Sequence, residues 1–222
     1  MKIFLLRHGT TEWNSKHKIQ GVTDISLDEI GKKMAHETNS ALFLREIGFD
    51  RVYSSPLKRA RDTAAIVAPG IEIIEDDRLK ELSFGDMEGR SVAELTADEN
   101  SPFRYFKSDP RKYDELAGEC EGAETLTQLC KRNADFMKTV IEPLYEVSPD
   151  DDILIAGHGA QSRALLMYVR GENNLAEFWG SGLLPNCGMA VFEYTNEKGY
   201  EILEPSIRLY SDELAAAVSA LL

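Results

Sequence analysis

The chain has 222 residues, of which 43% are apolar, and a formal net charge of −13. This length is enough to bury one substantial core, so the sequence predicts a single domain over 1–222. The negative charge argues against a nucleic acid or an anionic membrane as a partner, because either would be repelled over most of the surface.

Neither the apolar runs nor the cysteines point to export. The longest apolar runs are shorter than the roughly 18 residues that span a bilayer, and the charged Arg7 follows "MKIFLL" too early for a signal peptide. Cys120, Cys130 and Cys187 form no CxxC pair. An odd number of cysteines argues against a disulfide framework, so we expect free thiols and a cytoplasmic protein.

Short runs rich in Ile, Val, Leu and Phe alternate with helical patterns along the chain. Continuous apolar runs suit strands that are covered on both faces. The predicted strands are Ile3–Leu6, Arg51–Ser54, Ile71–Ile74, Ile153–Ala156 and Met189–Tyr194. The alternation predicts an α/β fold, a three-layer sandwich in which helices flank a mostly parallel central sheet.

The helices are predicted between these strands. "SLDE" supplies Ser26 as an N-cap with Glu29 three residues later, and Gly48 ends this first helix. Further helical patterns cover 57–67, 124–147 and 161–169. The tail "SDELAAAVSALL" predicts a C-terminal helix over 212–222 with Ser211 as N-cap, which docks on the core or, as the alternative, on a partner subunit.

Three polar clusters directly follow predicted strands. They begin at Arg7, after Val52 and Tyr53, and after Ala156. Because the carboxyl ends of parallel strands meet at one sheet edge, the clusters converge there. They bring together Arg7, His8, Arg59 and His158, with the backbone amides of Gly9 and Gly159. Guanidinium forks match phosphate geometry, so this set predicts a site for a tetrahedral oxyanion.

The histidines allow other interpretations. "RHG" alone is typical of an ordinary turn after a strand, and only the second and third clusters favour a functional site. We expect no metal, because neither His8 nor His158 lies in an HxxxH or HExxH pattern. His17 and His36 fit an exposed loop and an exposed helix face, and no role is expected for them.

The motifs "LLRHGTTEWN", "GVTDISLDEIG", "YSSPLKRARDTA", "RLKELSFGDMEG" and "GHG" occur in this order. In this combination the chain resembles the histidine phosphatase superfamily, also called the phosphoglycerate mutase-like family, from residue 1 to about 195. The resemblance implies that fold with a helical lid insertion at about 90–125. It also implies phosphoryl transfer to a small phosphomonoester through a phosphohistidine, without metal or cofactor.

The resemblance also assigns roles to residues. His8 would be the nucleophile, because a neutral imidazole needs no separate base. Arg7, Arg59 and His158 would stabilise the transferring phosphoryl group. Asn14, Gln20 and the amide of Gly21 would donate further hydrogen bonds. Glu81 would be the acid and base, with Glu88 as its nearest competitor. Arg61 would face away from the site, and Arg163 would be an exposed helical cation.

The reaction itself stays open between two branches of the family. Between residues 90 and 124, five basic residues stand against nine acidic ones, a net charge of −4 that suits a bisphosphorylated intermediate poorly. Phe103, Tyr105, Phe106 and Tyr113 in this segment line an apolar substrate wall or pack the lid onto its own core. We therefore expect a phosphatase, with a mutase as the alternative and a non-catalytic phosphate-binding regulator as the third. Nothing in the sequence requires a homodimer, although the terminal helix would allow one.

Overall fold

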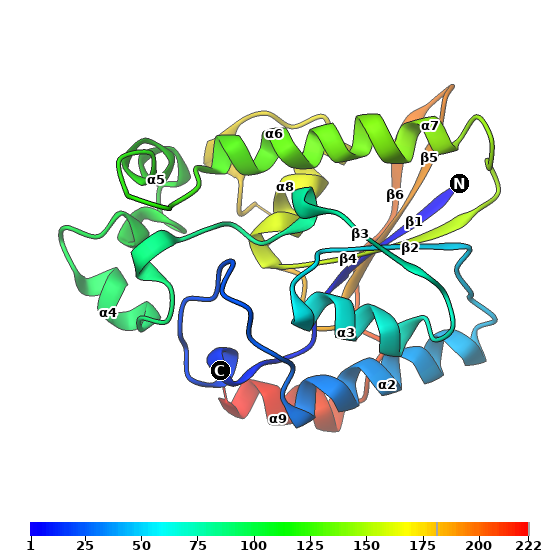
Figure 1. The fold of residues 1–222 in the computed structure, drawn as a ribbon, viewed down its shortest axis with the longest axis horizontal. Helices are drawn as coiled ribbons and strands as arrows, with labels where there is room; N and C mark the ends of the chain where they lie inside the picture. The colour runs from blue at the N-terminus through cyan, green and yellow to red at the C-terminus, as the bar shows by residue number, and fades with distance from the viewer. Residues whose placement is uncertain (181, 222) are drawn as a thin grey trace.

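The computed structural model describes residues 1–180 and 182–221, and this part of the chain folds around a six-stranded sheet in the order β3-β2-β4-β1-β5-β6 (Figure 1). The strands are β1 (Lys2–Arg7), β2 (Arg51–Ser54), β3 (Ile73–Glu75), β4 (Asp152–Gly157), β5 (Met189–Thr195) and β6 (Gly199–Ile207). β3, β2, β4 and β1 are parallel, whereas β5 and β6 are antiparallel to their neighbours. The predicted α/β fold with a mostly parallel sheet is confirmed.

The sheet edges differ from the prediction. β3 begins at Ile73 instead of Ile71, because Gly70 adopts a φ of +83° and turns the chain just before it. No strand is predicted where β6 lies. Glu204 and Pro205 are exposed on this edge strand, and such residues mask the strand pattern while they discourage pairing with other chains.

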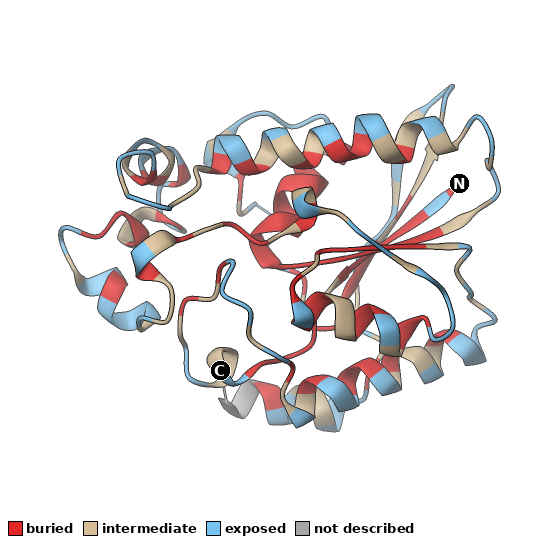
Figure 2. Cartoon of the chain, in the orientation of Figure 1, coloured by how far each residue is buried: buried red, intermediate tan, exposed pale blue. Residues whose placement is uncertain are grey.

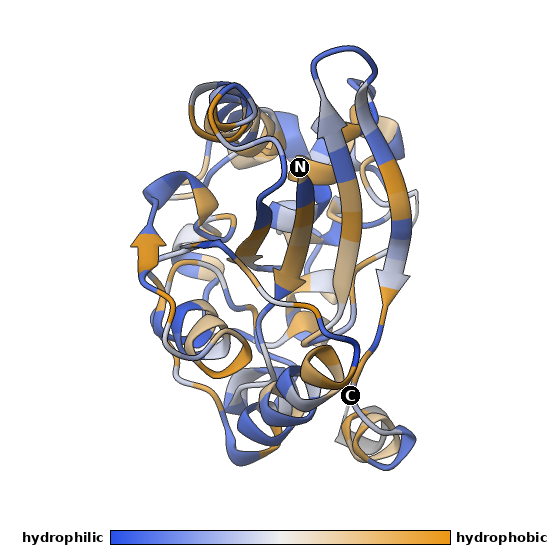
Figure 3. Ribbon diagram, turned by 90° about the vertical axis from the view of Figure 1, so that its right-hand side faces the viewer, coloured by the Kyte–Doolittle hydropathy of each residue, from blue (hydrophilic) through white to orange (hydrophobic). Residues whose placement is uncertain are grey.

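Helices cover both faces of the sheet (Figure 1). One face carries α2 (Glu29–Leu44), α3 (Lys58–Val67) and α9 (Asp212–Leu221); the other carries α6 (Leu126–Phe136), the π-helical η4 (Met137–Ile141), α7 (Glu142–Leu144) and α8 (Gly159–Val169). Successive side chains of a strand point to opposite faces. Ile3 and Leu5 of β1 therefore pack under α6 and α8, while Phe4 and Leu6 pack against α2 and α3. The central strands β1, β2 and β4 are mostly buried, whereas the edge strands β3 and β6 are partly exposed (Figures 2 and 3).

The predicted cap of α2 is wrong. Asp28, and not Ser26, is the N-cap, and its side chain accepts a hydrogen bond from the Gly31 N–H at 2.7 Å. Asp28 also accepts one from Thr10 Oγ1 at 2.7 Å, and this contact fixes the helix start two residues later. Ser26 is exposed in the preceding loop.

The helices predicted over 124–147 and 212–222 are both present, with small differences at their ends. The helix predicted over 124–147 runs from Leu126 to Leu144, and η4 widens it just before Pro143, whose ring disfavours the regular hydrogen bond. Ser211 Oγ accepts from the Leu214 N–H at 3.4 Å and caps α9. Val218 packs into the core beside α2, so α9 docks on its own chain. The predicted last residue, Leu222, lies outside the described residues.

Short helices lie beyond the carboxyl ends of the parallel strands, at the end of the molecule that carries α4 and α5 in Figure 1. They are α1 (Glu12–Ser15), η1 (Asp77–Leu79), η2 (Gly85–Met87), α4 (Val92–Ala97), η3 (Pro102–Tyr105), α5 (Pro110–Ala117) and η5 (Leu175–Glu177). The 90–125 segment is helical as predicted, and its Phe103, Phe106 and Tyr113 form a separate hydrophobic cluster with Phe178. No described helix is long and apolar enough to cross a bilayer. The three cysteines are free.

Candidate active site

His8 lies at the carboxyl end of β1 with only 4% of its surface exposed. Its Nδ1 lies 2.6 Å from the Gly9 carbonyl oxygen. Because a carbonyl only accepts, Nδ1 carries the proton and Nε2 keeps its lone pair. Burial, together with Arg59 and Arg7, holds the pKa of His8 well below its usual range. His8 is therefore a neutral imidazole with a bare Nε2.

His158 faces His8 from the end of β4, with the two ring centroids 5.2 Å apart. Its Nε2 lies 2.8 Å from Ser55 Oγ, which directly follows β2. Burial first, and then Arg59 and His8, lower the pKa of His158 well below its usual range. His158 is among the predicted site residues, whereas Ser55 is not, although it lies in one of the quoted motifs.

Arg59 on α3 is fully buried and is anchored by a loop of the chain, 21–23. Its Nη2 donates to the Gly21 carbonyl at 2.6 Å and its Nη1 to the Thr23 carbonyl at 2.9 Å. Burial lowers the pKa of Arg59 to about 10. Arg7 is anchored from the other side, where its Nη1 donates to the Leu184 carbonyl at 2.7 Å, and burial lowers its pKa too.

Four buried nitrogens of the predicted residues have no hydrogen-bond partner among the described residues. They are Arg7 Nε, Gln20 Nε2, Arg59 Nε and His158 Nδ1. Buried polar atoms are nearly always paired, so the unpaired N–H groups of Arg7, Gln20 and Arg59 indicate a place where an acceptor would bind. Gln20 is held for this purpose by Thr11, whose Oγ1 donates to Gln20 Oε1 at 2.7 Å.

Glu81 lies at the N-terminus of α8. Its Oε2 accepts from the N–H groups of Gly159 and Ala160 at 2.9 and 3.1 Å, and its Oε1 from those of Gln161 and Leu82 at 2.9 Å each. Four N–H donors match a carboxylate, which only accepts. Glu81 thus caps the helix that begins beside His158, which the sequence pattern does not reveal.

The competitor Glu88 is used elsewhere. It accepts from the N–H groups of Val22 and Thr23 at 3.0 and 2.8 Å, and from the Thr23 hydroxyl. It therefore holds the loop that anchors Arg59. A Cβ on Gly21 would lie 2.1 Å from Glu88 Oε1, which explains the glycine at this position.

The glycines of the site differ from the prediction. The Gly9 N–H donates to Thr63 Oγ1 at 3.1 Å, and the Gly159 N–H donates to Glu81, so neither amide is free. Gly9 is instead crowded, because a Cβ there would lie 2.7 Å from the Gly31 carbonyl oxygen, whereas a Cβ on Gly159 would meet its neighbours only at 3.4 Å. Gly21 offers its carbonyl to Arg59, and no hydrogen bond from its N–H to a described residue is seen. Phosphate binding by these glycines stays a prediction.

A cleft of about 170 Å³ opens beside these groups, and Arg59 and His158 are not in its lining. Its lining includes the predicted Arg7, His8, Asn14, Gln20, Glu81 and Gly159, together with Lys18, Ile19, Phe84, Phe103, Phe106, Ala160, Trp179 and Leu183. One wall is thus aromatic, and Phe103 and Phe106 serve both in it and in the packing of the 90–125 segment. Tyr113 is fully buried in that packing. Lys18 adds a cation to the lining that is not among the predicted site residues.

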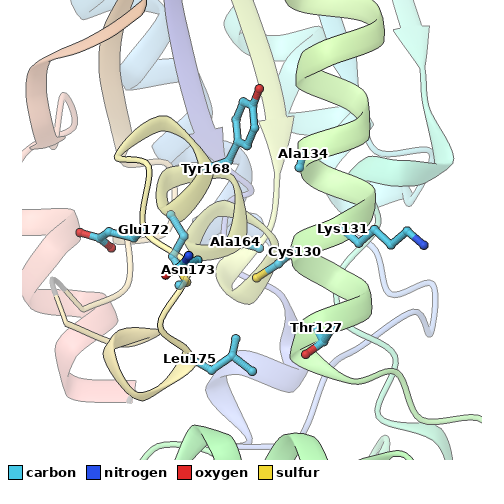
Figure 4. Close-up of a pocket in the computed structure, with 10 residues that line it drawn as sticks. Thr127, Cys130, Lys131, Ala134, Ala164, Tyr168, Glu172, Asn173 and Leu175 are labelled. Atoms are coloured by element: carbon cyan, nitrogen blue, oxygen red, sulfur yellow. The ribbon is translucent and has the colours of Figure 1, made fainter.

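A second cavity of about 290 Å³ lies between α6 and α8 (Figure 4). Figure 4 shows Cys130, Ala134 and Ala164 at its floor and Lys131 and Glu172 toward its rim. No residue of the predicted site lines it, and no group of three or more His, Cys, Asp or Glu side chains suited to a metal occurs among the described residues. The cavity therefore plays no part in the site.

Two arginines outside the site behave differently from each other. Arg61 is partly exposed and pairs with Glu75 at 3.5 Å, away from the cleft as predicted. The expectation for Arg163 is wrong, because it is 1% exposed and its Nε donates to the Phe178 carbonyl at 2.7 Å. Arg163 lies on the helix face that packs on η5, and the short helical pattern of α8 does not distinguish this face from an exposed one.

Two buried amides position the histidines and are absent from the prediction. Asn186 Nδ2 donates to the His8 carbonyl at 3.0 Å. Gln161 Oε1 accepts from the His158 N–H at 3.1 Å, and its Nε2 donates to Asn133 Oδ1 at 2.7 Å. Gly157 leaves room for this side chain, since a Cβ there would lie 1.9 Å from Gln161 Oε1. Only the place of Gln161, three residues after the histidine of "GHG", gives a sequence signal.

Known proteins resemble this chain over most of its length. The family described as the histidine phosphatase superfamily (branch 1) matches residues 3–204. An uncharacterized phosphatase PhoE of Bacillus subtilis is 31% identical over 88% of this chain and 90% of its own. A 2,3-bisphosphoglycerate-dependent phosphoglycerate mutase of Cytophaga hutchinsonii is 33% identical over 75% of this chain and 76% of its own.

A solved structure shows the same architecture. A phosphoserine phosphatase variant from Entamoeba histolytica, in complex with phosphoserine, superimposes with a TM-score of 0.73 and 28% identity. The match covers 91% of this chain and 94% of that one. Similarity thus extends to proteins named as phosphatases and to one named as a mutase.

Proposed function

Because the chain belongs to the histidine phosphatase superfamily, we propose that it is a metal-independent phosphomonoester hydrolase that acts through a phosphohistidine at His8. One observation carries this proposal: a neutral His8, whose Nε2 carries no proton, stands beside the unpaired N–H groups of Arg7 and Arg59 and the unpaired Nδ1 of His158. A nucleophilic lone pair next to unused cationic donors suits the attack on a phosphate ester.

In the first step, His8 Nε2 attacks phosphorus, the bond to the ester oxygen breaks, and this oxygen leaves with a proton. Arg7, Arg59 and His158 bind the oxygens of the transferring group and take the charge that a metal would otherwise balance. In the second step, water attacks the phosphohistidine and gives up a proton, and inorganic phosphate and neutral His8 result. Glu81 is the carboxyl group in the cleft lining; its protonated form would give the leaving oxygen its proton in the first step, and the resulting carboxylate would take the proton from water in the second.

A phosphatase fits the cleft better than the alternative mutase. The segment at 90–125, which we propose as a lid, contributes only Phe103 and Phe106 to the cleft lining among the described residues. It brings no cation that would hold the second phosphate of a bisphosphorylated intermediate. We propose a small phosphomonoester as the substrate and a cytoplasmic location, with Asn14, Gln20 and Gly21 as further phosphate-binding residues. A homodimer stays a prediction.

The test is phosphate release from a panel of phosphomonoesters that includes phosphoserine and phosphoglycerate, in EDTA. The wild type is compared with His8→Ala and with His36→Ala, a matched control because His36 is exposed on α2. We expect release by the wild type and the control, no release by His8→Ala, and an acid-labile phosphoenzyme in rapidly quenched wild-type reactions. Isomerised phosphoglycerate without phosphate release would establish the mutase. The absence of both free phosphate and isomerised phosphoglycerate would favour the phosphate-binding regulator.

A further inference from the structure

The segment that carries Glu81 has little regular structure of its own. It runs from η1, which ends at Leu79, to η2, which begins at Gly85, and residues 81–83 belong to no helix or strand. Its backbone carbonyls therefore need partners from outside the segment. The position of the Glu81 carboxylate depends on what supplies them.

Arg132 of α6 supplies these partners. Its Nη1 donates to the carbonyls of Arg78 and Lys80 at 2.5 and 2.7 Å, and its Nη2 donates to the Glu81 carbonyl at 2.9 Å. The remaining donors bind Glu124, from Nε at 2.6 Å and from Nη2 at 2.8 Å. All five N–H groups of the guanidinium are thus engaged.

Glu124 extends the same clamp. Its N–H donates to the Ser83 carbonyl at 2.8 Å, and its Oε2 accepts from the Ser83 N–H at 3.4 Å. Phe84 forms an isolated β-bridge with Ala123 directly beyond. The residues on both sides of the Glu81 side chain are therefore fixed to the beginning of α6.

We propose that Arg132 is a positioning residue, which holds Glu81 where its carboxylate reaches the leaving oxygen of the substrate. This inference rests on the proposed function, because it requires Glu81 to exchange protons. Arg132 does not line the cleft and touches no substrate. It fixes the backbone of Glu81 from one side, while the N-terminus of α8 fixes the carboxylate from the other.

The fork of arginine is essential to this role. Lysine has the same charge and three donors on one nitrogen, so Arg132→Lys keeps an ion pair with Glu124 but cannot reach three carbonyls and a carboxylate at once. Arg132 and Glu124 are partly accessible, with 18% and 17% of their side chains exposed.

The experiment measures kcat/KM for a series of para-substituted phenyl phosphates, because this ratio reports the first phosphoryl transfer. A protein that lacks its acid depends more steeply on the leaving group, since a poor leaving group needs the proton most. Wild type, Glu81→Gln, Arg132→Gln and Arg132→Lys are compared with Arg51→Gln. Arg51 is the matched control. It also pairs with a carboxylate, that of Asp151 at 2.8 Å, but it lies at the start of β2, at the end of the strand away from the site.

We expect both Arg132 variants to lose about 10- to 100-fold in kcat/KM for the poorest leaving group and less than about 3-fold for 4-nitrophenyl phosphate. Glu81→Gln should show the same pattern more strongly, and Arg51→Gln should behave as wild type. One outcome would overturn the positioning role alone. In it, Glu81→Gln steepens the dependence of kcat/KM on the leaving group, whereas both Arg132 variants lose kcat/KM equally for every ester or not at all. A wild type that hydrolyses no ester, or a Glu81→Gln without the steeper dependence, would overturn the acid role and this inference with it.

Discussion

The two buried histidines make the stability of this protein depend on pH. Burial and neighbouring arginines lower the pKa of both His8 and His158 well below the usual range, whereas in the unfolded chain both titrate near the ordinary value of about 6.5. As the pH falls below that value, the two histidines bind protons in the unfolded state but not in the native state. The stability contributed by the neutral rings is therefore complete above about pH 6.5 and declines below it.

The size of the effect follows from linkage. While both rings stay neutral in the native state, each ring lowers the free energy of unfolding by about 1.4 kcal/mol at one pH unit below the ordinary histidine pKa. At one pH unit above that pKa, the reduction is only about 0.1 kcal/mol. Together, His8 and His158 should remove about 2.5 kcal/mol of the free energy of unfolding between about pH 7.5 and 5.5. Other groups add to this loss equally in wild type and variants.

Urea unfolding at the two pH values measures this loss. The double variant with His8→Gln and His158→Gln has no titrating ring at the site, so its loss should be smaller than that of the wild type by about 2.5 kcal/mol. His36→Gln is the control, because His36 is exposed, and should lose as much as the wild type. An equal loss in the wild type and the double variant would refute the reasoning.

Three further substitutions test how the site is held. Gly31→Ala should lower the free energy of unfolding by about 1–3 kcal/mol, because its Cβ would lie 2.3 Å from a backbone carbonyl oxygen; Gly48→Ala, with open space around it, should not, and equal urea midpoints would contradict this. Glu88→Gln should raise KM for a phosphate ester about 5- to 10-fold with kcat nearly unchanged, since it loosens the loop that anchors Arg59; a fall in kcat alone in steady-state kinetics would argue against it. Asn186→Leu should destabilise the protein by about 0.5–1.5 kcal/mol in thermal unfolding, because the buried His8 carbonyl loses one hydrogen bond and keeps only the one from the Cys187 N–H at 3.2 Å; an unchanged melting temperature would contradict this.

The sequence predicts where the candidate site residues lie, because the direction of each strand alone decides at which edge of the sheet the next residue emerges. A polar residue that follows a strand of a parallel sheet must emerge at the carboxyl edge, whatever its rotamer. His8 and His158 illustrate this, since they directly follow β1 and β4; Ser55 directly follows β2 in the same way but is not among the predicted site residues. Arg59 follows by one further turn, within α3.

The sequence does not predict how these groups are paired. Whether an amide is free depends on side chains that arrive from remote segments, such as Thr63 at Gly9 or Glu81 at Gly159. The periodicity of α8 also does not indicate whether Arg163 is buried or exposed, because almost every face of that helix is covered. Such contacts depend on rotamers and on packing between layers, which hydrophobic spacing does not encode.

The setting of His8 has a consequence for synthesis on the ribosome. Asn186 holds the His8 carbonyl across 178 positions of the chain, and the Leu184 carbonyl anchors Arg7 across 177. A growing polypeptide that has already exposed "RHG" still lacks the groups that fix it until the segment before β5 emerges. His8, which we propose as the nucleophile, therefore acquires these anchors only after the segment before β5 has been made.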